Sequence, residues 1–189
     1  AFPVFAGALE AGGSVRAIVA KNAASALTRK EIDKLTEHAR GIGAKGLAYV
    51  RWVEDAPSCS FGKFLEEGQL DALLNALSCE KGDVVLIAAD KDKVALPVLG
   101  QLRGIAAKKL DIIPEGYNFL WITEFPFFEY DEEAQSYTAM HHPFTMPLDE
   151  CLDQLFTDPA AVRAKCYDLV LNGVELCSGS MRITDYALQ

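Results

Sequence analysis

Hydrophobic and polar residues alternate with two different periods along the first 110 residues of the chain. A period near two, or a continuous apolar run rich in β-branched residues, predicts strands at 14–20, 46–53 and 82–90. A period near 3.6 predicts amphipathic helices after Thr28, at 66–77 and at 92–110. The first half of the chain is therefore expected to interleave strands with helices.

Two of these helices carry signals for where they begin or end. Thr28, followed three residues later by Glu31, is typical of a capping box at a helix start, and Gly41 or Gly43 ends the run. Pro97 lies near the start of the third helix, so we expect the regular helix to open at that residue.

The pattern changes after Leu110, and Pro114 marks a boundary. Beyond it, an aromatic, strand-like run at 118–133 precedes a hairpin partner at 136–140, with an acidic turn between them. An irregular loop then leads to a short helix near 148–156. The second half is therefore expected to be rich in strands and to leave sheet edges exposed.

The dipeptide Asn172–Gly173, between two β-rich runs, is the strongest hairpin signal in the chain. A two-residue loop there predicts that Val170 faces Glu175 and that Asp168 faces Cys177, all on one face of the sheet. Asp168 and Glu175 are then diagonal neighbours about 7–8 Å apart, a separation from which two carboxylates are able to hold a hard cation such as magnesium. From spacing alone, two solvated acids on an exposed face are the alternative.

Arg182 and a pair of histidines are the other candidates for chemistry. Arg182 lies on a predicted strand, where its planar guanidinium either grips a carboxylate ligand or pairs with an acidic residue of the protein. His141 and His142 stand in the loop before Pro143, where they either act on an anion or a proton or are ordinary loop residues. With no third ligand nearby, the pair is a weak candidate for a metal site.

The formal net charge of −9 is unevenly distributed over the 189 residues. Residues 1–110 hold 15 Lys or Arg and 13 Asp or Glu, whereas residues 111–189 hold 3 and 14. Taken alone, the acidic total argues against a nucleic-acid partner, because a phosphate footprint needs clustered cations. The excess acid belongs to residues 111–189, however, and residues 1–110 are near neutral, so the net charge does not exclude such a partner. The asymmetry predicts two different units.

Composition excludes several further classes of protein. No apolar run approaches the length of about 20 residues that a membrane helix needs, and the first residues lack the basic start of a signal peptide. The five cysteines are odd in number and lack C-x-x-C spacing, which favours free thiols in a reducing compartment over disulfides or zinc. Because residue 1 is not Met, we expect the chain to begin inside a longer one.

Motifs in both halves of the chain resemble one enzyme family. The run at 119–133, the motif AMHHPFT at 139–145 and the motif YDLVLNGVEL at 167–176 resemble the catalytic domain of bacterial-type aspartyl-tRNA synthetases. The first half resembles the GAD insertion domain of these enzymes, a domain that also occurs in an archaeal tRNA-dependent amidotransferase. The resemblance implies a GAD insertion domain at 1–112 and part of a class II catalytic domain at 113–189.

The resemblance also implies a fold and an activity. The fold is α+β, with a two-layer insertion domain whose helices pack on one face of an antiparallel sheet, joined to part of an antiparallel catalytic sheet. Synthetases of this family join aspartate to ATP, with Mg²⁺, as aspartyl-adenylate and pass the aspartyl group to tRNA(Asp). By match of residues, Asp168 and Glu175 are implied to hold the metal, Glu175 to hold ATP, and Arg182, His141 and His142 to bind aspartate.

Some positions depart from the family pattern. Cys177 and Ser178 stand where the family has glycines, and we expect their side chains to narrow the pocket. Thr184 stands where the family has His, and Glu124 where it has Asp. We recognise neither the family's anticodon-binding domain nor the strands that carry its ATP-binding arginines, so we expect the chain alone to be inactive.

The parent enzyme is expected to be a cytoplasmic homodimer, or an organellar one if its source is a eukaryote, without membrane association. The alternative interpretation is a non-catalytic GAD-like module that binds tRNA or a protein.

Overall fold

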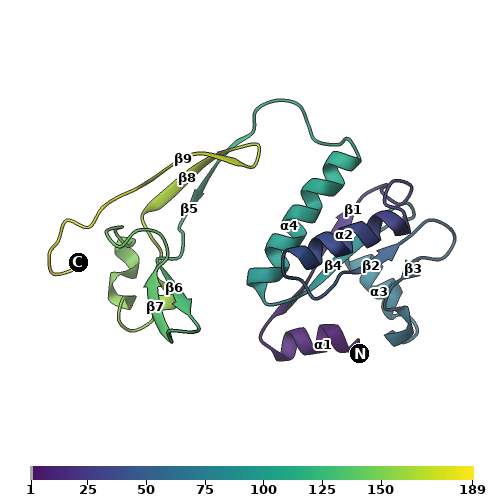
Figure 1. Cartoon of the computed structure of the whole chain (residues 1–189), viewed down its shortest axis with the longest axis horizontal. Coiled ribbons are helices and arrows are strands. Elements are labelled where there is room, and N and C mark those ends of the chain that lie inside the picture. Colours follow the sequence, from purple (N-terminus) through teal and green to yellow (C-terminus); the bar gives the residue numbers. More distant parts are fainter. Residues whose placement is uncertain (1) are drawn as a thin grey trace. The chain divides into compact units, whose positions relative to one another are not determined.

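The structure, a computed structural model, describes residues 2–189 and divides into two compact units (Figure 1). The N-terminal unit ends at Pro114 and the C-terminal unit begins at Glu115, whereas the division expected from the sequence falls after residue 112. The prediction of an α+β fold with antiparallel sheets is confirmed.

The N-terminal unit is built on a four-stranded antiparallel sheet in the order β1-β4-β2-β3. Its strands are β1 (Ser14–Ala20), β2 (Ala48–Arg51), β3 (Ser58–Cys59) and β4 (Val84–Asp90). β1 and β4 pair along their full length, from Ser14 opposite Asp90 to Ala20 opposite Val84. The three strands predicted for this half are therefore present, and the two-residue β3 is an addition.

Helices cover both faces of this sheet, which corrects the prediction that they lie on one face. The helices are α1 (Pro3–Glu10), α2 (Arg29–Gly41), α3 (Gln69–Ala76), α4 (Asp92–Lys109) and the 3₁₀ turn η1 (Gly62–Phe64). Leu86 on β4 belongs to a buried cluster with α2 and α4, whereas its neighbour Ile87 belongs to a second cluster with α1 and α3. The continuous apolar run of β4 is the signature of a strand buried on both faces.

Two predictions about helix starts are wrong in detail. Thr28 is the N-cap of α2, but its side chain makes no capping hydrogen bond. Glu31 pairs with Lys34 and Lys109, so it does not complete a capping box. α4 begins at Asp92 rather than Pro97, so the proline lies inside the helix.

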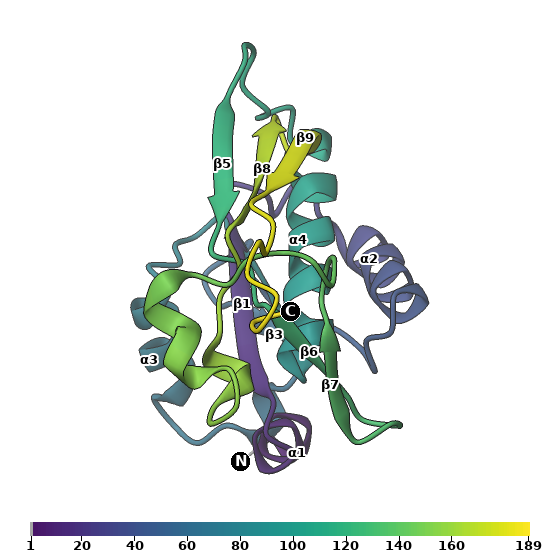
Figure 2. The same ribbon diagram turned by 90° about the vertical axis from the view of Figure 1, so that its left-hand side faces the viewer.

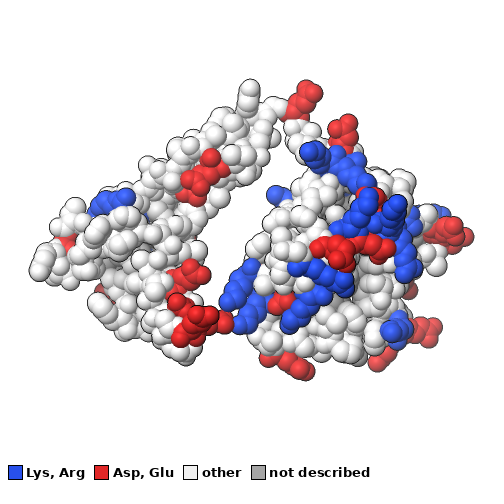
Figure 3. All heavy atoms as spheres, viewed as in Figure 1, with Lys and Arg blue, Asp and Glu red and all other residues white. Residues whose placement is uncertain are grey.

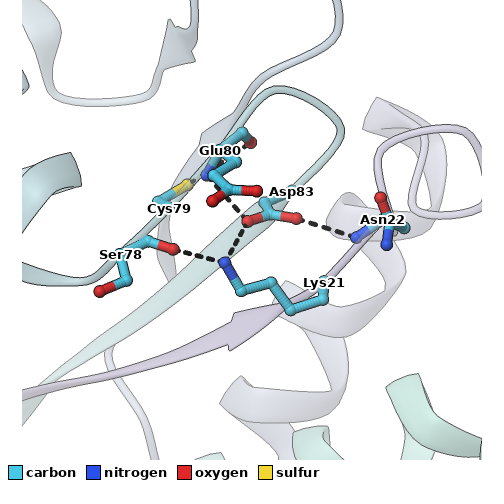
Figure 4. Close-up of polar contacts among 6 residues, drawn as sticks. All are labelled: Lys21, Asn22, Ser78, Cys79, Glu80 and Asp83. Atoms are coloured by element: carbon cyan, nitrogen blue, oxygen red, sulfur yellow. Dashed lines mark hydrogen bonds and ion pairs between the residues drawn. The ribbon is translucent and has the colours of Figure 1, made fainter.

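A buried carboxylate ties the turn after β1 to the turn before β4 (Figure 4). Asp83 is only 2% exposed and accepts hydrogen bonds of 2.9 Å from Lys21 Nζ and from the backbone N–H groups of Asn22 and Glu80. Burial opposes its ionisation, but these hydrogen bonds outweigh burial and hold the pKa of Asp83 below its usual range. Lys21 also donates to the carbonyl of Ser78, so one lysine closes the knot.

The C-terminal unit contains a three-stranded antiparallel sheet, a separate hairpin and two 3₁₀ turns. The sheet has the order β5-β8-β9, with β5 (Phe119–Thr123), β8 (Cys166–Leu171) and β9 (Val174–Ser180), which run side by side in Figure 2. The hairpin joins β6 (Phe128–Asp131) to β7 (Ser136–Ala139), as predicted. The turns are η2 (Asp149–Gln154), near the expected short helix, and η3 (Pro159–Ala161).

The strand-like run at 118–133 is not continuous. It breaks into β5 and β6 at Glu124, whose φ of 57° lies in the left-handed region, and at Pro126. The whole of β5 is exposed, including Phe119, Trp121 and Ile122. This unit therefore buries far less apolar surface than the N-terminal unit.

Candidate functional site

The hairpin between β8 and β9 turns at Asn172–Gly173, whose positive φ angles of 50° and 83° fit the turn that this dipeptide favours. Asn172 also fixes the hairpin to the start of β5. Its Oδ1 accepts the N–H of Asn118 at 2.9 Å, and its Nδ2 donates to the carbonyl of Gly116 at 2.9 Å. The local sequence thus sets the position of both strands.

A β-bulge changes the predicted register of this hairpin. Val170 faces Glu175 as predicted, but Leu169 faces Cys177, so Asp168 faces Ser178 and not Cys177. The extra residue in β9 removes Cys177 from the face that carries the two acids. Asp168 and Glu175 remain on a common face of the sheet, and both line one cavity.

Backbone pairing brings the histidine loop beside the end of β9. Thr145 forms an isolated antiparallel bridge with Arg182, flanked by hydrogen bonds from Met146 N–H to the carbonyl of Met181 (2.8 Å) and from Ile183 N–H to the carbonyl of Phe144 (2.9 Å). Two segments about 40 residues apart in sequence therefore share one ladder, which no local pattern could show.

Aromatic contacts hold both histidine rings. His141 meets Phe125 edge-on with ring centroids 4.9 Å apart, and His142 packs against Phe144 at 5.0 Å. Nδ1 of His142 accepts the N–H of Phe144 at 3.2 Å, so in the neutral ring the proton is on Nε2. That N–H is therefore left as a donor.

One cavity of about 300 Å³ brings together all five side chains that the sequence singled out. They are His141, His142, Asp168, Glu175 and Arg182. Sequence reasoning missed Thr145, Cys166 and Ser180, which also line it. Alternation along β8 and β9 could have placed Cys166 and Ser180, since each lies two residues from another member of the wall.

The two departures from the family glycines behave differently. Ser178 lines the cavity, whereas Cys177 does not, so the expectation that both side chains narrow the pocket is wrong for Cys177. The glycine that remains, Gly179, makes room for a side chain of the protein: a Cβ added there would lie 2.5 Å from the hydroxyl of Tyr167. Burial and the nearby Asp168 raise the pKa of the Cys166 thiol, which disfavours the reactive thiolate in the cavity wall.

Arg182 is the one cation of the C-terminal unit whose side chain has no protein partner. Lys165 pairs with Asp149 at 2.6 Å, and Arg163 donates to the carbonyls of Ala160 and Val162. Across residues 115–189, by contrast, no hydrogen bond or ion pair reaches the guanidinium of Arg182. Neither Asp168 nor Glu175 pairs with this guanidinium, although both line the same cavity. The guanidinium is therefore available to bind an anionic group of a ligand.

The oxygen donors of the cavity fit magnesium better than a transition metal. No group of three or more His, Cys, Asp or Glu within residues 2–189 is arranged to hold a metal. Magnesium does not require such a cage, because it is bound by one or two carboxylates together with water and substrate phosphates. Asp168 and Glu175 supply the two carboxylates of that donor set, and Ser178 and Ser180 line the same cavity.

Comparison with known proteins identifies the family of the N-terminal unit. The GAD domain family matches residues 5–99, which is half of the chain. The chain belongs to the GAD domain family. The resemblance of the first half of the chain to a GAD domain, inferred from the sequence, is thus confirmed.

Three bacterial relatives match nearly the whole chain. The aspartate–tRNA(Asp/Asn) ligase of Lachnoclostridium phytofermentans is 56% identical over 184 residues, which is 96% of this chain and 31% of the ligase. The aspartate–tRNA ligase of Agathobacter rectalis is 54% identical over 184 residues, which is again 96% of this chain and 31% of the ligase. The aspartate–tRNA(Asp/Asn) ligase of Caldanaerobacter subterraneus is 50% identical over 100% of this chain and 32% of the ligase. The chain thus spans about a third of the length of these relatives.

The comparisons confirm the resemblance to bacterial-type aspartyl-tRNA synthetases over both units. Among the helices of residues 2–189, none combines the length and the apolar character needed to cross a bilayer.

Proposed function

We propose that the chain is the GAD domain (residues 1–112) and part of the catalytic domain (residues 113–189) of an aspartate–tRNA ligase. The ligase activates aspartate with ATP to aspartyl-adenylate and transfers the aspartyl group to tRNA(Asp). The observation that carries this proposal is the cavity itself, in which the unpaired Arg182 shares a wall with two carboxylates and two fixed histidines.

The roles of the side chains follow from their charge and position. Arg182 grips the side-chain carboxylate of aspartate, and it disfavours asparagine, whose NH₂ group turns donors toward the guanidinium. His141 and His142 line the aspartate and adenylate pocket, where the Nε2–H of His142 is a fixed donor. These are binding roles, since no side chain here needs to move a proton.

Adenylation needs positioning more than acid or base chemistry. The nucleophile is the α-carboxylate of aspartate, which is ionised at neutral pH because its pKa lies near 3.5. The new bond joins this carboxylate oxygen to the α-phosphorus of ATP while pyrophosphate leaves. Asp168 and Glu175 would hold Mg²⁺, which would neutralise phosphate charge, and Glu175 also holds ATP. The protein's part is to hold both substrates in line.

The experiment is to install this chain in place of the matching 184 residues of the Lachnoclostridium phytofermentans ligase. We expect the chimera to catalyse aspartate-dependent pyrophosphate exchange and the 189-residue chain alone to show none. Arg182→Gln should abolish exchange without changing stability by more than about 0.5 kcal/mol, because the side chain is exposed and unpaired. Exchange that survives Arg182→Gln, or exchange by the isolated chain, would contradict the proposal.

A second function, RNA binding by the GAD domain, is favoured by the charge of the N-terminal unit. Lys and Arg side chains gather on the face of this unit seen in Figure 3. The ion pair of Glu31 with Lys109 brings the start of α2 to the end of α4, where the exposed cations are Arg29, Lys30, Lys34, Lys108 and Lys109. The total charge of −9 therefore does not exclude a phosphate-binding footprint on this face, as the near-neutral charge of residues 1–110 already indicated.

Salt dependence tests the RNA-binding function. We expect the chain to bind tRNA in a filter assay, with an affinity that falls steeply with salt. Replacing both Lys30 and Lys108 by Glu should weaken binding by about tenfold or more, while Lys63→Glu, a cation elsewhere in the unit, should not. Equal losses for both changes would indicate a general charge effect and no defined footprint.

The proposal extends to the whole enzyme. Its partners are aspartate, ATP and tRNA(Asp), it is a homodimer, and it works in the cytoplasm without a membrane.

A further inference from the structure

Two polar side chains that line the cavity, those of Thr145 and Arg182, both lack a protein partner. The hydroxyl of Thr145 is buried, in a residue only 3% exposed, and has no hydrogen bond. The guanidinium of Arg182, with five N–H donors, has none either within residues 115–189. A buried hydroxyl without a partner is uncommon, because the missing hydrogen bond is costly, and so it calls for an explanation.

The backbone places these two side chains on the same side of the ladder. Thr145 and Arg182 form an antiparallel bridge, and residues directly opposite in such a pair point to one face with Cβ atoms about 4.5–5.5 Å apart. Both residues line the same cavity, in agreement with this geometry. The hydroxyl oxygen is an acceptor, and the guanidinium offers only donors, so they complement each other.

We propose that Thr145 positions Arg182: its hydroxyl accepts one N–H of the guanidinium when the arginine turns into the cavity to grip the carboxylate of a bound amino acid. The hydrogen bond leaves the two N–H groups of the fork's open edge for the ligand. It also satisfies the orphaned hydroxyl, so ligand binding and this hydrogen bond support each other.

The inference rests on the proposed function, because it needs an amino-acid carboxylate as the ligand of Arg182. It predicts that removing the hydroxyl of Thr145 raises KM for aspartate and leaves KM for ATP unchanged. A threonine that serves only packing would behave differently. Its replacement would lower the stability of the C-terminal unit and weaken the binding of both substrates to a similar extent.

The experiment compares Thr145→Val, which keeps the shape and removes the hydroxyl, with Thr145→Ser, which keeps the hydroxyl. Both changes are made in the chimeric ligase described above, and Thr138→Val, an exposed threonine on β7, is the matched control. The pyrophosphate exchange assay gives KM for aspartate and for ATP, and the melting temperature of the 189-residue chain gives stability.

We expect Thr145→Val to raise KM for aspartate by about tenfold, the size of one hydrogen bond to a charged group, with KM for ATP within about twofold. Thr145→Ser should restore KM for aspartate to within about threefold of the starting value. Thr145→Val should not lower the melting temperature, because removing an unpartnered hydroxyl at constant shape costs little.

Two results overturn the inference while the proposed function stands. One is a KM for aspartate that stays within about twofold in Thr145→Val, and the other is an equal rise in both KM values with a lowered melting temperature. If the unmodified chimera shows no aspartate-dependent exchange, the proposed function fails, and this inference fails with it.

Discussion

The N-terminal unit and the C-terminal unit divide stability and chemistry between them. Of the 24 buried hydrophobic side chains in residues 2–189, 20 lie in the N-terminal unit and only Cys151, Val162, Ala164 and Val170 in the other. Yet the cavity that gathers the candidate site lies in the C-terminal unit. A site can therefore be assembled by backbone ladders and turns with little core beneath it.

The two units differ in buried side chains because they differ in how many faces of their sheets are covered. β4 is buried on both sides by two clusters of helices, whereas β5 is exposed along its whole length. Apolar area removed from water is the main stabilising term in folding, so the two units are expected to differ widely in stability. Four changes test whether the two units differ in this way.

The largest effect is expected from the core of the N-terminal unit. Leu86→Ala, at a fully buried position of β4, should lower its unfolding free energy by about 2–5 kcal/mol, because a cavity is left between the sheet and α2 and α4. Urea unfolding can be followed in each unit separately, since Trp52 lies in one and Trp121 in the other. The signal of Trp52 should shift, and that of Trp121 should not.

Leu120→Ala in β5 is the matched control, because Leu120 is half exposed. It should cost less than about 1 kcal/mol. If both tryptophan signals shift together with Leu86→Ala, the units unfold as one and the comparison fails.

The polar knot at Asp83 should give the next effect. Asp83→Asn keeps the shape but loses the charge that accepts three hydrogen bonds, and we expect a loss of about 2 kcal/mol. Asp55→Asn is the control: Asp55 pairs with Lys81 but is fully exposed, so its removal should cost less than about 0.5 kcal/mol. Equal effects would mean that burial of the carboxylate does not matter.

A smaller effect is expected in the C-terminal unit from Gly179→Ala. The new Cβ would lie 2.5 Å from the hydroxyl of Tyr167, so the ring must move, which changes its present edge-on contact with Trp121 at a centroid distance of 5.5 Å. The ring is partly exposed and able to move, so we expect a cost of about 1 kcal/mol. An altered Trp121 emission in a Trp52→Phe background would report the movement, and an unchanged spectrum would refute the clash.

The smallest effect should come from pH. Hydrogen bonds from Lys109 and Lys34 lower the pKa of Glu31 from 4.5 to about 2. A lowered pKa means that the stabilisation is complete above pH 4.5 and is lost as the pH falls toward 2. The difference in urea midpoint between the parent chain and Glu31→Gln, read from Trp52, should therefore shrink between pH 6 and pH 2.5. A difference that stays constant over this range would contradict the pairing.

Much of the fold could be predicted where local signals agree. The predicted strand at 14–20 matches β1, and the Asn172–Gly173 turn joins β8 to β9. Where signals depend on distant residues, prediction failed. The capping box at Thr28 lost Glu31 to Lys109, a residue 78 positions away, and α1 carried no pattern strong enough to be predicted.

For the candidate site, the residue types could be predicted and the register could not. Because of the bulge in β9, Ser178 and not Cys177 lies on the cavity wall. No residue in the turn predicts this bulge. The bridge of Thr145 with Arg182 joins segments that are far apart in sequence, so the orphaned hydroxyl becomes visible only in three dimensions.

Periods, turns and motifs in the sequence were enough to predict the α+β class, the hairpins, the family and the five candidate side chains. These depend on near neighbours along the chain, through backbone conformation and side-chain alternation. Three findings required the folded chain: helices cover both faces of the first sheet, Arg182 has no partner within residues 115–189, and Thr145 is paired with it across the ladder. Those facts depend on which distant groups meet, and burial and hydrogen bonding exist only once they do.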